Sequence, residues 1–313
     1  VIFVMLVTAF FFPHFFRVSA SIVLPGVATE LKLSTSLVGL ISSMYFYAYA
    51  IMQFFGGALN DRFGSVIVGS CGIAVNGIGV LLFAFASSPA ELIIGKLFMG
   101  LGLAPILSGV LVFQSRYFKK EKYTFLSSVT FAVGNLGAIT SVAPLEIILS
   151  LWGRKYVFIG LALLNFLLSI MLLKMKKFDS IPEQKNINKG KMMLSILNQL
   201  KESLLKLKGS KQLKLMLILW GISFGSLMSL QGLWAVSWYG KLYGVTTKTA
   251  SYWATLIGIG VMIGSLLAGQ IGKDSKSRNK IIVDVCYLNC FSWFLLLVSI
   301  NFKMGLVVTG LMG

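Results

Sequence analysis

The strongest constraint on this sequence is a series of long apolar runs, each of about 20 residues, separated by shorter polar stretches. A run of this length crosses a bilayer as a helix, because a helix satisfies its own backbone hydrogen bonds in hydrocarbon. The runs cover residues 1–27, 35–59, 65–87, 90–114, 123–149, 152–174, 213–239, 249–271 and 281–301, and another begins at 304. The sequence therefore predicts an all-α integral membrane protein.

Composition agrees with a membrane setting. The chain is 57% hydrophobic and only 12% charged, whereas soluble domains are about one quarter charged. A net charge of +18 would suggest nucleic-acid binding in a soluble protein. Here most Lys and Arg lie in turns and in a Lys-rich segment, residues 175–212, which is typical of topology determinants. We therefore exclude nucleic acid as a partner and expect the lipid bilayer as the surroundings.

The basic residues also predict an orientation. If the turn 57–64 is placed inside, the same side receives the basic cluster at 116–122, the segment 175–212 and the basic residues of 273–280. The other side receives only scattered Lys and Arg. Since basic loops stay in the cytoplasm, we expect a multi-pass protein with a cytoplasmic linker, in the inner (cell) membrane if the source is bacterial.

Six apolar runs precede the Lys-rich segment and a second set follows it, which is typical of a duplicated transporter. We predict an N-terminal six-helix bundle over 1–174, a basic linker over 175–212 and an incomplete C-terminal bundle over 213–313. The chain starts within one run and stops as another begins, which predicts a fragment with about ten helices. Within the linker, 191–208 is either a basic amphipathic helix on the membrane surface or a solvated tether.

The turn between the second and third runs carries a motif. It reads Gly57-Ala-Leu-Asn-Asp61-Arg62-Phe-Gly64 and resembles the loop signature of the major facilitator superfamily, Gly-x-Leu-x-Asp-Arg-x-Gly. The basic residues that follow in the family are absent at 65–67. We expect Asp61 to cap a helix N-terminus and Arg62 to lie among the headgroups. The alternative is an ordinary hairpin whose Asp and Arg are only solvated.

A second resemblance lies in the fourth run. Lys96 opens a stretch ending Gly100-Leu-Gly102-Leu-Ala104, similar to the superfamily pattern Arg-x-x-x-Gly-x-Gly-x-Ala with Lys in place of Arg. We assign Lys96 to the conformational motif together with the hairpin, and the alternative is a lysine that snorkels to the headgroups. The drug/proton antiporters of this superfamily place Gly-Pro in the fifth helix, where this chain has Ala143-Pro144, which counts against drug efflux.

The resemblance covers the whole chain and implies a fold of two six-helix bundles. It also implies a substrate held between the bundles near the midplane and released by alternating access. The resemblance therefore implies a secondary transporter rather than an enzyme. It implies no cofactor beyond a coupled proton or sodium ion, and we expect a monomer.

Arg17 is the leading candidate for substrate binding. It lies well inside the first run with no acidic residue within a helical turn, and a charge at that depth costs about 2.5–3.5 kcal/mol unless it faces water or a partner. Its fork of donors suits a carboxylate or phosphate. The alternative is a salt bridge to another helix. His14, the only histidine, is three residues earlier and is a proton-coupling candidate; packing is the alternative.

Two polar stripes are further candidates for the cavity wall. In the second run Tyr45, Tyr49 and Gln53 recur every four residues on one helix face. In the seventh run Gln231 and Trp234 share a face at a spacing of three and combine an aromatic wall with an amide. For both stripes, ordinary contact between helices is the alternative.

The pattern around Arg17 resembles the sugar-phosphate and organic-anion permease branch of the superfamily. Members that exchange organophosphates have a second arginine in the seventh helix, and the corresponding stretch here, 230–232, has none. We therefore expect a singly charged anion or a zwitterion, such as a carboxylate metabolite or small peptide, in preference to a sugar phosphate. The alternative is a membrane sensor of the same fold that binds a solute without moving it.

No sequence pattern of an enzyme or metal site stands out. There is no Ser-His-Asp set and no phosphate-binding loop. Cys71, Cys286 and Cys290 lie inside apolar runs without a cluster of His or acidic residues, so we expect packing residues and not metal ligands.

Overall fold

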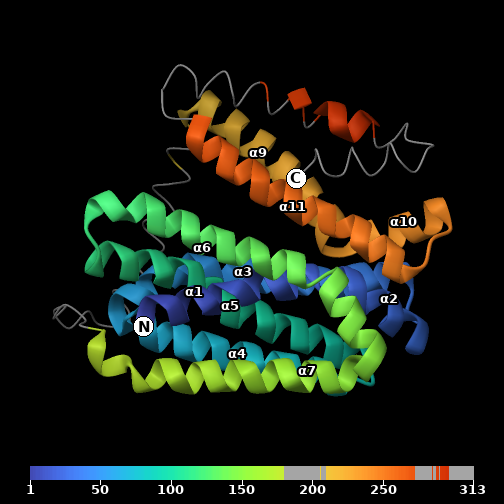
Figure 1. The fold of residues 1–313 in the computed structure, drawn as a ribbon, viewed down its shortest axis with the longest axis horizontal. Coiled ribbons are helices and arrows are strands. Elements are labelled where there is room, and N and C mark those ends of the chain that lie inside the picture. The colour runs from blue at the N-terminus through green and yellow to red at the C-terminus, as the bar shows by residue number, and fades with distance from the viewer. Residues whose placement is uncertain (180–204, 206–208, 272–283, 285–286, 289, 296–313) are drawn as a thin grey trace.

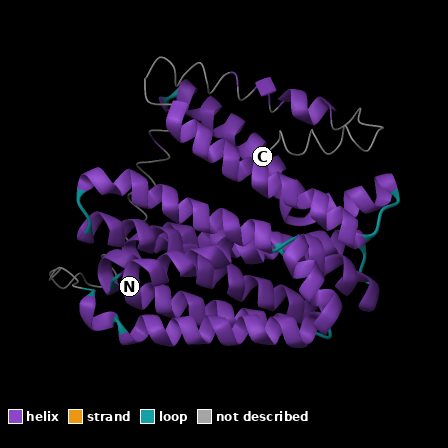
Figure 2. Ribbon diagram, viewed as in Figure 1, coloured by secondary structure: helices purple, strands orange, loops and turns teal. Residues whose placement is uncertain are grey.

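The computed structural model describes residues 1–179, 205, 209–271, 284, 287–288 and 290–295. Within these ranges the regular secondary structure is helical, without a strand (Figure 2). The prediction of an all-α fold is confirmed. The helices of the first half are α1 Ile2–Val18, α2 Ala20–Glu30, α3 Thr35–Phe63, α4 Ser65–Phe85, α5 Pro89–Tyr117, α6 Lys120–Thr140, α7 Ala143–Lys174 and the 3-10 helix η1 Lys176–Phe178. Those of the second half are α9 Lys211–Ser229, η2 Leu230–Trp234, α10 Ala235–Tyr243 and α11 Thr247–Ile271.

Several of these helices are long enough to cross a membrane. Among the described residues five helices have the necessary length and apolar character, and six if the bent pair α1 and α2 forms one span. The described residues leave out most of the linker and more than half of the predicted ninth run, 281–301. They also leave out nearly all of the possible amphipathic helix 191–208 and the whole run from 304.

Cys71 and Cys290 are exposed, so the prediction that they are packing residues is wrong.

Glycines allow α4 and α5 to pack backbone to backbone. A Cβ atom at Gly102 of α5 would collide with the backbone oxygen of Gly72 on α4. Two turns further along, a Cβ at Gly95 would lie 3.0 Å from the backbone oxygen of Gly79. Small residues of this kind let membrane helices approach closely enough for dispersion contacts and interhelical polar contacts.

Buried polar pairs join α4 to α7. Asn76 donates from Nδ2 to Asn165 Oδ1 at 2.8 Å, and the hydroxyls of Ser70 and Ser169 each donate to the other residue's carbonyl at 2.8 Å. All four side chains are buried. Each bond of this type stabilises helix association by roughly 0.6 kcal/mol in a membrane. The pairs therefore contribute more to the register between α4 and α7 than to the free energy of their association.

Two predicted runs are interrupted. The first is bent by 45° between α1 and α2. The fifth run, predicted at 123–149, is divided between α6 and the beginning of α7, because Pro144 has no backbone N–H and lies in the first turn of a new helix. The fifth and sixth runs then join in one long helix, α7, with a break at Gly153, whose φ of 73° is readily adopted by glycine.

The bundle has two ends, which we call the linker end and the far end. At the linker end α3, α5 and α7 finish, and the linker begins after α7. At the far end α2 lies beside α10 (Figure 1). A shared apolar core joins the two halves there, and it consists of Val18, Ile22, Ala138, Val142, Leu230, Ala235, Val236, Tyr239, Ala250, Ala254 and Ile257.

The linker end of α9 is different. Its residues from 211 to 220 are all exposed, and the shared core contains none of them. Among the described residues, the two halves of the chain therefore meet mainly through the far-end parts of their helices.

Candidate functional site

Arg17 lies in the last turn of α1, next to the 45° bend. Its Nε atom is buried and has no hydrogen-bond partner. The ion pairs found in the described part of the chain are Asp61–Arg116 and Glu30–Arg154, and neither involves Arg17. The salt bridge considered as an alternative is thus absent from the described residues. A guanidinium in this position can take its anion from solution.

Two tyrosines of α3 lie near Arg17. The phenol groups of Tyr45 and Tyr49 are close enough to the guanidinium for an electrostatic interaction, and their rings stack with centroids 5.8 Å apart. Tyr45 is held in place because its Oη donates a hydrogen bond to the carbonyl of Pro13 on α1 at 2.9 Å. The structure therefore brings together Arg17, Tyr45 and Tyr49, three of the site residues predicted from the sequence.

The stripe on α3 becomes more exposed toward the linker end. Tyr45 is only 3% exposed, Tyr49 is half-buried and Gln53 is exposed. Gln53 is about two turns from Tyr45 and is the most accessible of the three. The exposure of this helix face thus increases toward the linker end, while the shared apolar core lies at the far end.

The second half of the chain approaches Arg17 through η2. A Cβ at Gly232 would lie 3.6 Å from the backbone oxygen of Arg17 and 3.7 Å from the ring of Phe46 on α3. The backbone of η2 therefore passes directly beside the bend in the first span. Single π-turns inside α-helices often mark functional positions, and this one places both halves of the chain at the candidate site.

Gln231 and Trp234 face different helices instead of forming one wall. Trp234 lies against α3, with its Cζ2 atom 4.0 Å from the Cβ position of Gly39. Gln231 is 4% exposed, and its Nε2 lies 3.6 Å from the Cβ position of Gly258 on α11. The sequence prediction assumed the α-helical repeat, but the wider turn of a π-helix separates side chains three residues apart.

Lys96 of α5 is buried rather than extended to the headgroups. It is 2% exposed, and its Nζ donates to the carbonyl of Phe16 at 3.3 Å. The ammonium also lies 5.2 Å from the centroid of the Phe83 ring, a cation–π geometry. Phe16 is the residue before Arg17 and lies on the turn that leads into the bend. Lys96 thus holds the backbone from which the Arg17 side chain extends.

His14 packs against α6. Its ring meets Phe10 edge-on at 4.8 Å, and a Cβ at Gly134 of α6 would lie 2.9 Å from His14 Nδ1. Its Nδ1 atom is buried without a hydrogen-bond partner. The histidine is close enough to Arg17 for an electrostatic interaction, so a change of charge on either residue would be felt by the other.

The hairpin motif is more helical than the sequence predicted. Gly57, Asp61 and Arg62 all lie within α3, and only Gly64, with φ 83° and ψ 152°, connects α3 to α4. This backbone region is almost exclusive to glycine. Asp61 does not cap α4 as expected; it forms an ion pair with Arg116 of α5 at 3.0 Å. The guanidinium of Arg62 lies 5.3 Å from the ring centroid of Phe63.

The cap of α4 comes from the start of the linker. The backbone N–H of Val66 donates to Asp179 Oδ2 at 2.9 Å, and Tyr117 Oη donates to Asp179 Oδ1 at 3.1 Å. Sequence reasoning missed this role, because the two partners are more than 100 residues apart. It also missed Asn60, which is buried and donates from Nδ2 to the carbonyl of Pro105 at 3.0 Å.

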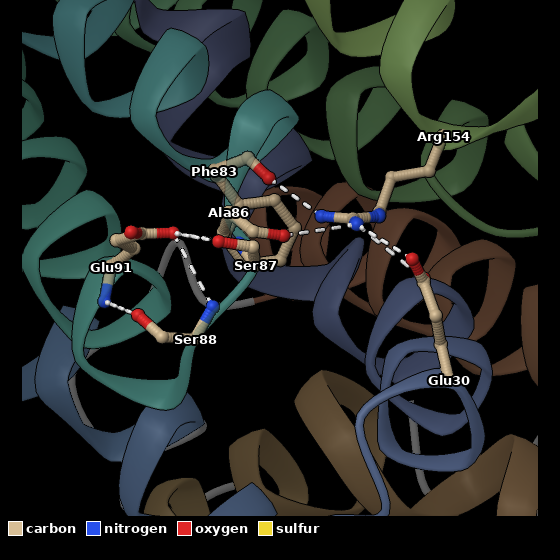
Figure 3. Close-up of polar contacts among 7 residues, drawn as sticks. All are labelled: Glu30, Phe83, Ala86, Ser87, Ser88, Glu91 and Arg154. Carbon is tan, nitrogen blue, oxygen red and sulfur yellow. Dashed lines mark hydrogen bonds and ion pairs between the residues drawn. The ribbon is translucent and has the colours of Figure 1, made fainter.

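A second cluster fastens the far end of the first half (Figure 3). Arg154, directly after the break in α7, donates to the carbonyls of Phe83 at 2.9 Å and Ala86 at 3.2 Å and pairs with Glu30 at 3.3 Å. It connects the end of α2 to the end of α4. Beside it, Ser88 and Glu91 form a capping box at the start of α5.

The described residues contain no group of three or more His, Cys, Asp and Glu side chains that could hold a metal ion. The site consists instead of the half-buried guanidinium of Arg17 beside Tyr45 and Tyr49, with the buried ammonium of Lys96 bound to the residue before Arg17. Such a group of side chains can bind a small anion and orient it, and it does not form a set of nucleophile, base and oxyanion donors.

Comparison with known proteins gives a consistent result. The family model described as Major Facilitator Superfamily matches residues 6–313. The chain is 27% identical over 161 residues to the probable sulfoacetate transporter SauU of Cupriavidus necator, covering 51% of this chain and 37% of that protein. It is 26% identical over 165 residues to the hexuronate transporter of Bacillus subtilis, covering 51% and 38% of the two chains. These matches span well under half the length of either relative.

The fold is similar to a solved structure as well. The xylose transporter XylE from E. coli superimposes with a TM-score of 0.73 at 13% sequence identity, covering 99% of this chain and 82% of that chain. At this identity the likeness concerns the fold alone.

Proposed function

This chain belongs to the major facilitator superfamily, a family of transporters and not of enzymes, and on that premise we propose that it moves a small organic anion or zwitterion across its membrane by alternating access. The substrate is a carboxylate metabolite or small peptide in preference to a sugar phosphate. The protein acts as a monomer, in the inner (cell) membrane if the source is bacterial, with the linker in the cytoplasm, and a proton or sodium gradient drives it.

One observation carries the proposal: Arg17 is a half-buried cation inside the first span, and its Nε atom is buried without a hydrogen-bond partner. Leaving such a charge unpaired costs about 2.5–3.5 kcal/mol, and an anionic substrate would remove that cost. The free energy gained when the anion pairs with Arg17 contributes to the affinity for the substrate. A single arginine neutralises one negative charge, which favours a monoanion or zwitterion over a phosphate dianion.

The surroundings of Arg17 supply orientation. Tyr49 and Gln53 continue the α3 face from Tyr45 toward the linker end, and Trp234 of η2 packs against α3 at Gly39. Binding sites of this composition hold the apolar body of a ligand by aromatic contact and fix its orientation through a few polar groups. The two relatives transport sulfoacetate and hexuronate by their names, and both of these solutes are organic anions.

Alternating access is supported by the difference between the two ends. The shared core closes the far end, whereas the stripe from Tyr45 to Gln53 opens toward the linker end. If the linker is cytoplasmic, this is an inward-facing arrangement. Transport then requires the far-end contacts of α2 with η2 and α10 to separate while the linker ends of the two halves come together.

Proton coupling is assigned to His14. Its partnerless Nδ1 and its proximity to Arg17 would let proton binding and substrate binding influence each other, since an anion at Arg17 offsets the repulsion between two cations. Uptake by wild-type protein and a His14→Gln variant would be compared with and without an imposed pH gradient. Uptake that still follows the gradient in the variant would remove His14 from this role.

The test uses the full-length protein reconstituted in liposomes. Uptake of labelled monocarboxylates, dipeptides, a sugar phosphate and a neutral sugar would be measured for wild type, Arg17→Gln and Arg17→Lys, with exposed Lys241→Gln as the control. We expect uptake of one anionic or zwitterionic class, loss of at least tenfold in Arg17→Gln and no change in Lys241→Gln. Undiminished anion uptake by Arg17→Gln would refute the proposal. Substrate binding without uptake would indicate the sensor.

A further inference from the structure

The linker end carries two basic segments that the proposed transport function does not use. Lys119, Lys120 and Lys122 lie at the turn from α5 to α6, and all three are exposed. Lys174, Lys176 and Lys177 lie at the end of α7 and in η1, and they are exposed as well. We call these six lysines the basic surface.

The two segments are held together by Asp179. Its carboxylate accepts hydrogen bonds from Tyr117, two residues before Lys119, and from the backbone N–H of Val66. The side chain is only 7% exposed. A buried carboxylate with a partner on each oxygen is a rigid connection, so the segment from Lys174 to Phe178 is positioned against the turn between α5 and α6.

Little negative charge opposes the basic surface. Of the acidic residues described at this end, Asp61 is paired with Arg116, and Asp179 is buried. Glu121, within the same basic stretch, is exposed. The lysines therefore produce a positive potential that a ligand of opposite charge can neutralise.

Exposed aromatic rings accompany the lysines. Phe178 is 65% exposed, Phe125 68% and Tyr123 37%. Rings of this kind are unfavourable in water and favourable at the boundary between headgroups and acyl chains, where lysine stems also lie along apolar surface. A soluble anion would neutralise the lysines but would leave these rings uncovered.

We propose that the basic surface and its aromatic rings form a binding site for acidic phospholipid headgroups of the leaflet at the linker end. The phosphates contact Lys119, Lys120, Lys122, Lys174, Lys176 and Lys177, and the acyl chains cover Phe125 and Phe178. The hydrogen bonds of Asp179 hold the two segments at a fixed separation, so lipid binding does not first have to order them.

The site is tested by lipid retention on the purified full-length protein. Native mass spectrometry and binding titrations in detergent would compare phosphatidylglycerol with phosphatidylcholine. The test variant replaces Lys120, Lys122 and Lys177 by Gln. The control variant replaces Lys32, Lys241 and Lys248 by Gln, three exposed lysines outside the basic surface, so both variants lose the same charge.

We expect preferential retention of phosphatidylglycerol by wild type and by the control variant. Each lysine removed from the basic surface should weaken retention about fivefold, which corresponds to about 1 kcal/mol per charge. Tyr117→Phe keeps the charge and removes one hydrogen bond to Asp179, and it should weaken retention severalfold. Equal losses in the two lysine variants, or equal retention of both lipids by wild type, would overturn the proposal. Displacement of the lipid by millimolar inorganic phosphate would identify a simple anion site instead.

Discussion

Lys96→Met is expected to impair substrate binding far more than it affects folding. The substitution removes the hydrogen bond from Nζ to the Phe16 carbonyl and the cation–π contact with Phe83. A hydrogen bond to a charged group contributes about 1.5–3 kcal/mol, and a desolvated cation–π contact about 2 kcal/mol. The same change relieves the burial of an ammonium, which costs about 2.5–3.5 kcal/mol in a membrane. These opposing contributions leave a net loss of stability of about 0–2.5 kcal/mol.

No such cancellation applies to the effect of Lys96→Met on substrate binding. Phe16 precedes Arg17, so loss of its hydrogen bond frees the backbone that carries the guanidinium at the bend. We expect the substrate concentration for half-maximal uptake to rise about tenfold, equivalent to about 1.4 kcal/mol, with a smaller change in maximal rate. Lys96→Arg, which restores the residue of the family pattern, should retain most of the affinity.

The assay combines uptake in liposomes with thermal unfolding of the full-length protein. Lys155→Met is the matched control, because Lys155 also lies over an aromatic ring, that of Phe85 at 5.0 Å, but is exposed. Unchanged affinity in Lys96→Met would refute the reasoning that Lys96 positions Arg17. A fall in stability of the size expected for an uncompensated loss of both contacts would show that the buried charge carries no cost here.

Three further predictions concern the scaffold. Gly64→Ala should lower the free energy of unfolding by about 1–3 kcal/mol, because φ 83° with ψ 152° is strained for any side chain; Gly57→Ala, with open space around its Cβ position, should not. Thermal melts in detergent measure both, and equal melting temperatures would contradict the strain argument. Gly100→Val should prevent folding, because its Cβ would collide with a backbone carbonyl of α3; monodisperse protein on size-exclusion chromatography would count against that packing. Arg154→Gln should destabilise by roughly 1–3 kcal/mol, since two carbonyls lose their donor, whereas Glu30→Gln removes only an exposed ion pair worth about 0–1 kcal/mol. Denaturant titration distinguishes the two, and equal losses would contradict this assignment.

The sequence alone was sufficient for the fold class. Apolar runs long enough to cross a bilayer leave a helix as the only way to satisfy the backbone, so an all-α fold follows from length and hydropathy. The patterns around Asp61 and Lys96 indicated the family. Arg17 stood out because a charge inside an apolar run needs a partner, and that cost is local and visible in the sequence.

Tertiary structure decided how these residues are used. Asp61 pairs with Arg116 instead of capping α4, and Asp179 provides the cap; the partners are far apart in the sequence, so no local pattern could select them. Lys96 could have snorkelled, and only the packing of α5 against the bend directs it inward.

The same division applies to the candidate binding site. The sequence analysis placed Gln231 and Trp234 on one face because it assumed the regular α-helical repeat throughout the seventh run. The π-turn over Leu230–Trp234 changes that period, and it forms where η2 packs beside the bend next to Arg17. The sequence alone determined how unfavourable each polar or charged residue is in a membrane. The partner that pairs with each of these residues depends on contacts between helices, and those contacts exist only once the chain has folded.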